Sequence, residues 1–169
     1  KENKKEVEKA EGVPEKESLF LANDSILTTK WYASGTPFSK ETIKSDTLIS
    51  GEYYSPTNEL EAKIENGSGQ RLIRDVSGII LSKETFKNYQ VVNETLYHPN
   101  KTPKTIAAFR DGQKHGAYKT FSEDGAPLKV ENYKSGELEG LSTYYQNAMK
   151  CLEVQYVQGL KHGVQKRFV

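Results

Sequence analysis

The stretch "FRDGQKHGAYKTFSEDGAPLKVEN" at 109–132 decides the fold, because its spacing returns twice further along the chain. The second copy is "YKSGELEGLSTYYQNAMKCLEVQ" at 133–155, and the third is "YVQGLKHGVQKRFV" at 156–169. Each copy opens on an aromatic residue, has a glycine three places on, a second glycine four places later, and another aromatic residue five places after that. Such self-similarity indicates a repeat protein, in which each unit is stabilised by its neighbours.

Two further copies lie upstream in the same register. "IENGSGQRLIRDVSGIILSKET" begins at Ile64, and "FKNYQVVNETLYHPNKTPKTIAA" begins at Phe86, with Tyr89 in the place of the first glycine. The starting points 64, 86, 109, 133 and 156 are therefore 22, 23, 24 and 23 residues apart. This spacing predicts a repeat period of about 22–24 residues.

Within one copy, two short segments read as strands. "AYKTF" at 117–121 and "LKVENY" at 128–133 are rich in Tyr, Thr, Val and Phe, and Gly, Asp, Pro and Ser surround them. We expect one turn at "SEDGAP" and another at "KSGELEG", so that each copy is a hairpin of two strands. The sequence therefore predicts an all-β fold, an elongated, twisted antiparallel meander of β-hairpin repeats.

The chain divides into two regions by composition. Eleven of the first eighteen residues are Lys or Glu, which predicts that 1–18 form a charged spacer, disordered or marginally helical. The repeat domain is expected over 19–169, clear at 109–169, less regular at 64–108 and weak at 19–63, with an insertion between Gly35 and Tyr53. The chain opens on lysine, which fits either a removed leader or an engineered truncation, and we expect a secreted or envelope-anchored location rather than a cytoplasmic one.

Charge and composition restrict the partners. The 24 basic and 23 acidic residues give a net charge of +1, so neither a nucleic acid nor an anionic membrane would be attracted by bulk electrostatics. The near-neutral charge therefore gives little support to lipid binding, which stays a possible function. The single cysteine, Cys151, permits no internal disulfide and is interpreted as a packed strand residue.

The histidines do not indicate a metal site. His115 and His162 occupy equivalent places in copies two units apart, so about four strand spacings, or roughly 19 Å, separate them, too far to share one ion. We interpret both as turn residues, and His98 as another. No Gly-x-Ser-x-Gly elbow or phosphate loop occurs, and we predict no enzyme, no metal and no cofactor. Six glycines are predicted to be structural turn residues: Gly112, Gly116, Gly136, Gly140, Gly159 and Gly163.

The pattern aromatic-x-x-Gly-x-x-x-Gly-x-x-x-x-aromatic, with "DGQKHG", "SGELEG" and "QGLKHG" as its turns, resembles the MORN repeat. The likeness is to the bacterial variant of YwqK-like proteins, which are described as antitoxins. That resemblance implies a curved antiparallel sheet that acts as a scaffold or a binding surface.

A binding role would then come from the shape of the sheet. We predict a non-enzymatic scaffold that binds another protein through an aromatic-lined face or edge. Three alternatives stay open: an envelope-associated structural module that assembles through its strand edges, a homo-oligomer formed through an exposed edge strand, and an antitoxin-like neutralising protein. The candidate contact residues are Tyr97, Phe121, Tyr144, Tyr145 and Phe168.

Overall fold

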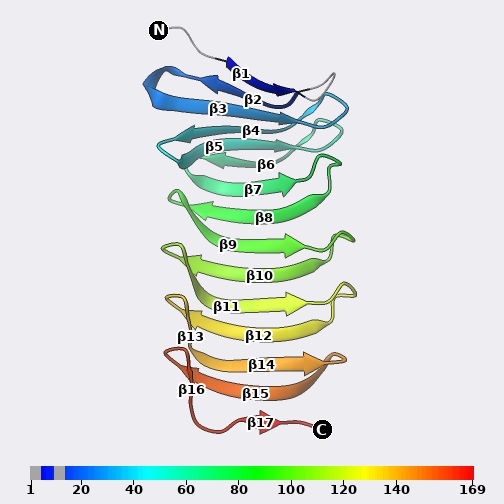
Figure 1. Ribbon diagram of the computed structural model, residues 1–169, viewed down its shortest axis with the longest axis vertical. Coiled ribbons are helices and arrows are strands. Elements are labelled where there is room, and N and C mark those ends of the chain that lie inside the picture. Colours follow the sequence, from blue (N-terminus) through cyan, green and yellow to red (C-terminus); the bar gives the residue numbers. More distant parts are fainter. Residues whose placement is uncertain (1–4, 10–13) are drawn as a thin grey trace. The chain divides into compact units, whose positions relative to one another are not determined.

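The computed structural model describes residues 5–9 and 14–169 and divides the chain into two compact units, Lys1–Gln90 and Val91–Val169. Each unit is an antiparallel meander in which strands follow one another in chain order (Figure 1). Among the described residues the one helical segment is a short 3-10 turn, η1 (Ala22–Asp24). The predicted fold class, an all-β antiparallel meander, is confirmed for both units.

Unit 1 contains eight strands joined by short turns. They are β1 (Lys5–Lys9), β2 (Pro14–Phe20), β3 (Ser25–Trp31), β4 (Pro37–Lys44), β5 (Thr47–Tyr54), β6 (Leu60–Glu65), β7 (Ser68–Arg74) and β8 (Ile80–Lys87). Each strand from β1 to β7 pairs antiparallel with the next one, and the register crosses the sheet from Thr28 to Glu41 to Gly51 to Ile64.

Unit 2 continues the same pattern from the boundary residue Gln90. Its strands are β9 (Gln90–Tyr97), β10 (Pro103–Arg110), β11 (Gln113–Phe121), β12 (Pro127–Lys134), β13 (Glu137–Leu138), β14 (Gly140–Gln146), β15 (Met149–Val157), β16 (Leu160–Lys161) and β17 (Lys166–Arg167). Because β12 pairs with both β13 and β14, and β15 with both β16 and β17, each of these short pairs acts as one interrupted strand.

The strands are joined by two kinds of turn that alternate along most of the chain. The first kind, here called tight turns, has two central residues that both have positive φ, as a type I′ hairpin requires. The tight turns are centred on Ser45 with Asp46, Asn66 with Gly67, Asn88 with Tyr89, Asp111 with Gly112, Ser135 with Gly136, Asn147 with Ala148, and Gln158 with Gly159. Their sequences explain the glycine spacing, since glycine tolerates positive φ best.

The second kind, here called wide turns, contains five residues. The N–H of the first residue donates to the carbonyl of the fifth, and the N–H of the fourth donates back to the carbonyl of the first, all at 2.8–3.0 Å. The fourth residue has positive φ in every case. The wide turns are 32–36, 55–59, 75–79, 98–102 and 122–126. The predicted turns at "SEDGAP" and "KSGELEG" are therefore a wide turn followed by a tight turn, as the repeat requires.

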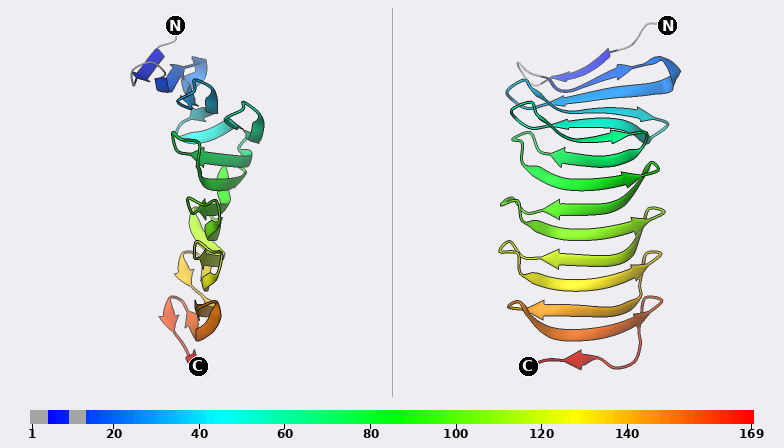
Figure 2. Two further views of the ribbon diagram at one scale, coloured as in Figure 1. Left: turned by 90° about the vertical axis from the view of Figure 1, so that its right-hand side faces the viewer. Right: turned by 180° about the vertical axis from the view of Figure 1, so that it is seen from behind.

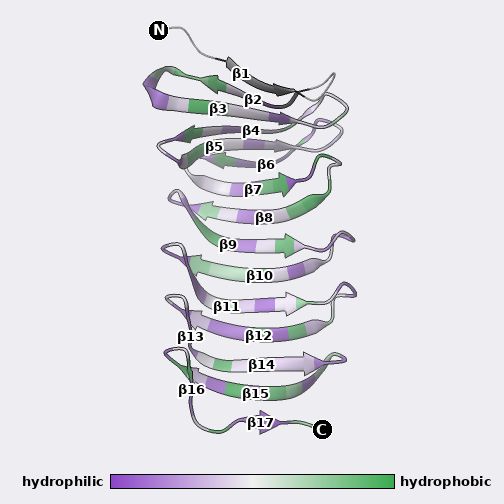
Figure 3. Ribbon diagram, viewed as in Figure 1, coloured by the Kyte–Doolittle hydropathy of each residue, from purple (hydrophilic) through white to green (hydrophobic). Residues whose placement is uncertain are grey.

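Each unit buries one face of its sheet, here called the buried face. In unit 1, Tyr53 and Ile64 are each 1% exposed, and in unit 2 Ser142 is 1% and Ala107 is 2% exposed. Within each unit the described strands form a single layer, and the right view of Figure 2 shows these strands from behind. The buried residues are not uniformly apolar, since they include Glu41, Glu131 and Ser142. Figure 3 shows hydrophilic and hydrophobic residues mixed along the strands, with β12 mostly in hydrophilic colours. The core of each unit is thus a mixed polar and aromatic surface.

The predicted insertion between Gly35 and Tyr53 is wrong. These residues form β4, a tight turn and most of β5, and successive tight turns begin at 45, 66, 88, 111, 135 and 158 without interruption. Tyr32, three residues before Gly35, opens a wide turn, whereas Tyr133, three residues before Gly136, precedes a tight turn. No glycine marks the tight turn at Ser45 and Asp46, so its place in the repeat was not visible in the sequence.

The first residues also differ from the expectation. Within the predicted spacer, the structure places 5–9 in β1 and 14–18 in β2, instead of a disordered or marginally helical segment. The two strands pair in antiparallel register, with Glu6 opposite Ser18. The remaining residues of the predicted spacer, 1–4 and 10–13, lie outside the described residues.

Candidate functional site

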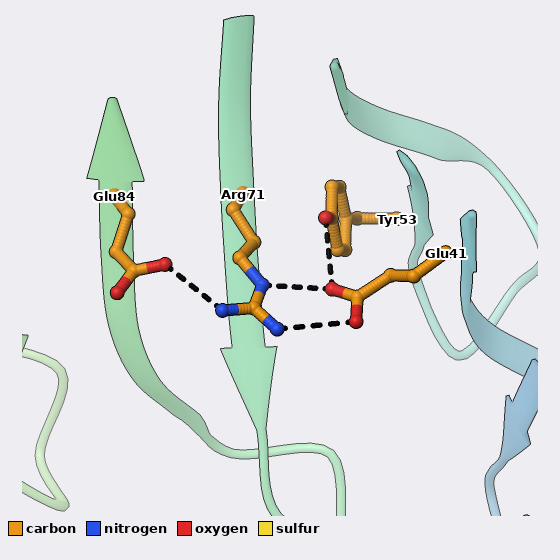
Figure 4. A network of polar contacts seen from close by, with 4 residues as sticks. All are labelled: Glu41, Tyr53, Arg71 and Glu84. Carbon is orange, nitrogen blue, oxygen red and sulfur yellow. Dashed lines mark hydrogen bonds and ion pairs between the residues drawn. The ribbon is translucent and has the colours of Figure 1, made fainter. Parts of the chain in front are cut away.

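The buried face of unit 1 contains a four-residue polar network that joins four strands (Figure 4). Arg71 on β7 donates from Nε to Glu41 Oε1 at 2.7 Å and from Nη2 to Glu41 Oε2 at 3.1 Å, a bidentate pair. Its Nη1 donates to Glu84 Oε2 at 3.2 Å, and the Tyr53 hydroxyl donates to Glu41 Oε1 at 2.9 Å. One guanidinium therefore binds two carboxylates, one from β4 and one from β8.

The environment of this network shifts its ionisation. Burial opposes the charged form of Glu41, but the hydrogen bonds and the positive charge of Arg71 outweigh it and lower the pKa of this carboxyl below 4.5. Burial, with the charge of Glu41, raises the pKa of the Tyr53 hydroxyl. The pKa of Arg71 is raised, because its bonds to Glu41 outweigh its own burial. These shifts favour charged Glu41, charged Arg71 and neutral Tyr53, which are the protonation states that pair best. This is the behaviour of a structural network.

The buried face of unit 2 contains an equivalent carboxylate. Glu131 on β12 is 5% exposed and accepts hydrogen bonds from Lys129 Nζ at 2.9 Å, Tyr133 Oη at 3.2 Å and Tyr144 Oη at 3.3 Å. Burial, followed by the charge of Glu131, raises the pKa of Tyr133 to about 12. The pKa of Tyr144 is also raised, by burial first and then by a hydrogen bond with Tyr156. Two tyrosines and a lysine thus bind this carboxylate, and a third tyrosine, Tyr156, lies beside Tyr144.

Glu41 and Glu131 occupy the same place in the repeat. Each is the fifth residue after a wide turn and follows a proline that begins the strand, in "PFSKE" at 37–41 and "PLKVE" at 127–131. The equivalent residue is Ile64 on β6, Glu84 on β8, Ala107 on β10 and, by register, Val154 on β15. Carboxylates and apolar residues therefore alternate at this position along the chain. The similar segments "PFSKE" and "PLKVE" indicate that Glu41 and Glu131 are equivalent, but only when the positions of the wide turns are known.

Two tyrosine rings on the buried face of unit 2 form a corner that contains a lysine ammonium. The ring centroids of Tyr118 and Tyr133 are 5.9 Å apart at 73°. Lys114 Nζ lies 3.8 Å from the Tyr118 centroid and 4.9 Å from the Tyr133 centroid. These distances are those of cation–π contacts. No spacing in the sequence indicates this arrangement, because the three residues come together only through the register of β11 and β12.

The structure separates the five predicted contact residues into two groups. Tyr144 lies on the buried face and bonds to Glu131. Tyr97 and Phe121 end β9 and β11 directly before wide turns, Tyr145 is the next-to-last residue of β14, and Phe168 follows β17 and is 43% exposed. These four residues lie at equivalent strand ends and do not form one cluster with Tyr144.

The predicted turn residues have defined positions. Gly112, Gly136 and Gly159 are the second residues of tight turns, and the glycines four places later also have positive φ. His115 Nδ1 accepts from the backbone N–H of Ser135 at 3.4 Å. Glu139, the equivalent residue, accepts from the N–H of Gln158 at 2.8 Å. Each side chain therefore binds the next tight turn.

His98 opens the wide turn 98–102, as expected of a turn residue, and its Nε2 lies 3.0 Å from the carbonyl oxygen of Phe121. Cys151 is half-buried on β15 and its Sγ donates to the carbonyl of Tyr144 at 3.4 Å. Within 5–9 and 14–169, no group of three or more His, Cys, Asp or Glu residues is placed to hold a metal ion. In the same part of the chain, no helix has the length and apolar character needed to cross a membrane.

No protein-family model matches this chain, and no curated protein matches it. A solved structure, described as "Crystal structure of GtfA/B complex", is similar to 68% of this chain and to 20% of that chain, with 14% sequence identity and a TM-score of 0.27. A likeness at that score carries no argument about fold or function.

Proposed function

We propose that this chain is a non-enzymatic scaffold of MORN-like repeats that binds another protein through the buried face of unit 2. The observation that carries the proposal is that Tyr118, Tyr133 and Tyr144 remain half-exposed on the face that buries Glu131. Within unit 2 the described strands form one layer, so these rings face outward from it. Tyrosine is a favoured contact residue because its ring is large, its hydroxyl is polar and it has few rotatable bonds.

The rings are also fixed before any partner arrives. Glu131 accepts hydrogen bonds from the hydroxyls of Tyr133 and Tyr144, and the ring of Tyr118 packs edge-on against that of Tyr133. A contact surface that is already ordered loses little side-chain entropy on binding. This supports a protein-binding surface over a loosely packed core.

A capture experiment with matched variants tests the proposal. Wild-type chain, Tyr144→Phe and Tyr118→Ser would be immobilised and exposed to lysate from the source organism, and captured proteins would be identified and quantified by mass spectrometry. Tyr89→Ser, which removes a 46% exposed tyrosine in unit 1, is the control. We expect a protein captured by wild type and by Tyr89→Ser to be lost from Tyr118→Ser and reduced for Tyr144→Phe.

A second measurement keeps the test independent of folding. Circular dichroism and thermal unfolding would establish that each variant retains the β-sheet. Isothermal titration with the captured protein would then compare affinities. Equal capture and equal affinity for all folded variants would overturn the proposal for this face. The earlier candidates Tyr97, Phe121, Tyr145 and Phe168 stay predictions that the same assay can examine.

A further inference from the structure

The corner formed by Tyr118 and Tyr133 already holds a positive charge, supplied by the chain itself. Lys114 Nζ lies within 5 Å of both ring centroids, at 3.8 and 4.9 Å, and Lys129 Nζ lies 5.4 Å from the Tyr118 centroid. The two rings meet at 73°, so an ammonium between them contacts two electron-rich surfaces at once. Both tyrosines and Lys114 are half-buried, so the corner is open to solvent on one side.

A local irregularity of β11 lies beside the corner. Gly116 is the register partner of Tyr133 and lies between Lys114 and Tyr118 along β11. A Cβ at Gly116 would meet only Ala108 within 4 Å, at 3.6 Å. The register between β10 and β11 shifts at this point, because Tyr118 pairs with Ala107 whereas Lys114 pairs with Phe109. Lys114 and Tyr118 therefore lie on either side of a bulge.

The electrostatics of the corner favour a cation. The Tyr133 hydroxyl donates to Glu131 Oε2 at 3.2 Å, so a buried carboxylate lies at the hydroxyl end of one of the two rings. Lys129 is paired with Glu131 at 2.9 Å and is thereby held in place. Lys114, by contrast, follows the exposed tight turn of Asp111 and Gly112 on a long, flexible side chain that can leave the corner.

We propose that this Tyr118/Tyr133 corner is a binding site for an ammonium group, and that Lys114 is its resident occupant, which an incoming primary or methylated ammonium displaces. The ligand class follows from charge complementarity, because the site presents two ring faces with a carboxylate at the hydroxyl end of one ring. We infer that a lysine of a protein partner carries the natural ammonium, and this part of the proposal rests on the proposed scaffold function. The affinity of the corner for an ammonium group does not depend on that function.

Choline and its neutral carbon analogue, 3,3-dimethylbutan-1-ol, distinguish charge from shape. Each would be titrated into the full chain while the ring resonances of Tyr118 and Tyr133 are followed by NMR. The variants are Lys114→Gln, which removes the ammonium that contacts both rings, and Lys119→Gln, which removes an exposed lysine from the same strand and serves as the charge-matched control. Lys114→Gln combined with Tyr118→Leu removes one wall.

We expect Lys114→Gln to bind choline about tenfold more tightly than wild type and Lys119→Gln do, because an occupied site binds in proportion to the fraction that is free. The neutral analogue should bind at least about fivefold more weakly, and the double variant should lose the response. Equal binding of choline by Lys114→Gln and Lys119→Gln would overturn the proposal, as would equal shifts with the neutral analogue. Since no partner takes part, failure here rejects the ammonium site, whereas unchanged capture in the lysate assay rejects the scaffold proposal.

Discussion

The ring of Tyr89 lies over Gly67, so that a Cβ added to Gly67 would come within 2.1 Å of Tyr89 Cδ1. The two residues are the second residues of consecutive tight turns, and both have a φ of 66°. The N–H of Tyr89 also donates to the carbonyl of Gly67 at 2.8 Å. The ring and the backbone of Tyr89 therefore both contact the preceding tight turn. The tyrosine that replaces glycine in this repeat has a packing role.

Gly67→Ala is expected to destabilise unit 1 by about 2 kcal/mol, because alanine is strained at positive φ and its Cβ collides with the Tyr89 ring. In a Tyr89→Gly background the collision is removed, and the same substitution should cost only about 1 kcal/mol. Urea unfolding of the four proteins measures the difference. An identical cost in both backgrounds would show that the ring contact contributes nothing.

The network of Glu41 and Arg71 is the second test. Glu41→Gln leaves Arg71 with Glu84 as its one charged partner in the network, and Arg71→Met leaves Glu41 and Glu84 without the guanidinium. Each variant should cost about 3 kcal/mol. The double variant should cost clearly less than the sum, by about 1–3 kcal/mol, because the two substitutions remove one interaction. A double-mutant cycle measured by chemical denaturation gives this coupling, with the exposed Glu52→Gln as a control expected to change stability by less than about 0.5 kcal/mol. Strict additivity would contradict the ion pair.

The same carboxylate predicts a pH dependence. The pKa of Glu41 is lowered from 4.5 in the folded state, so the folded chain holds this proton less tightly than the unfolded chain. Its contribution is present above pH 4.5 and is lost as the pH falls through the folded pKa. We expect the difference in unfolding free energy between wild type and Glu41→Gln to be constant from pH 7 to about pH 5 and to narrow below that. A difference that widens on acidification would reverse the assignment.

The turn contacts of Glu139 and His115 provide a fourth prediction. Glu139→Ala removes the charged acceptor of the Gln158 N–H, and we expect a loss of about 1–2 kcal/mol. His115→Ala removes a longer bond, 3.4 Å to the Ser135 N–H, and should cost less. Amide hydrogen exchange should rise at Gln158 in the first variant and at Ser135 in the second. Unchanged exchange at both amides would show that these side chains do not bind the turns.

Much of the strand-and-turn pattern could be predicted from the sequence, because glycine at positive φ marks the tight turns of the clearest copies. The N-terminal copies were less visible for the same physical reason. The tight turns at Ser45 with Asp46 and at Asn88 with Tyr89 use residues other than glycine at positive φ.

The polar networks could not be predicted from the sequence. Glu41 meets Arg71 thirty positions away, and that contact depends on the register of every intervening strand. Similarly, Lys114 and Tyr133 come together only because β11 carries a bulge at Gly116. Tyr144 is a neighbour of Tyr145, the aromatic residue of the repeat pattern, whereas its contact with Glu131 follows from the pairing of β12 with β14.

Every feature of the buried faces depends on strand register, since a slip of one residue would move Glu131 and Ser142 to the opposite face. Cross-strand backbone NOEs in an isotopically labelled sample measure this register directly. The structure predicts contacts that pair Tyr118 with Glu131 and Ser142 with Val154. Contacts that instead pair Tyr118 with Val130 or Asn132 would contradict the account.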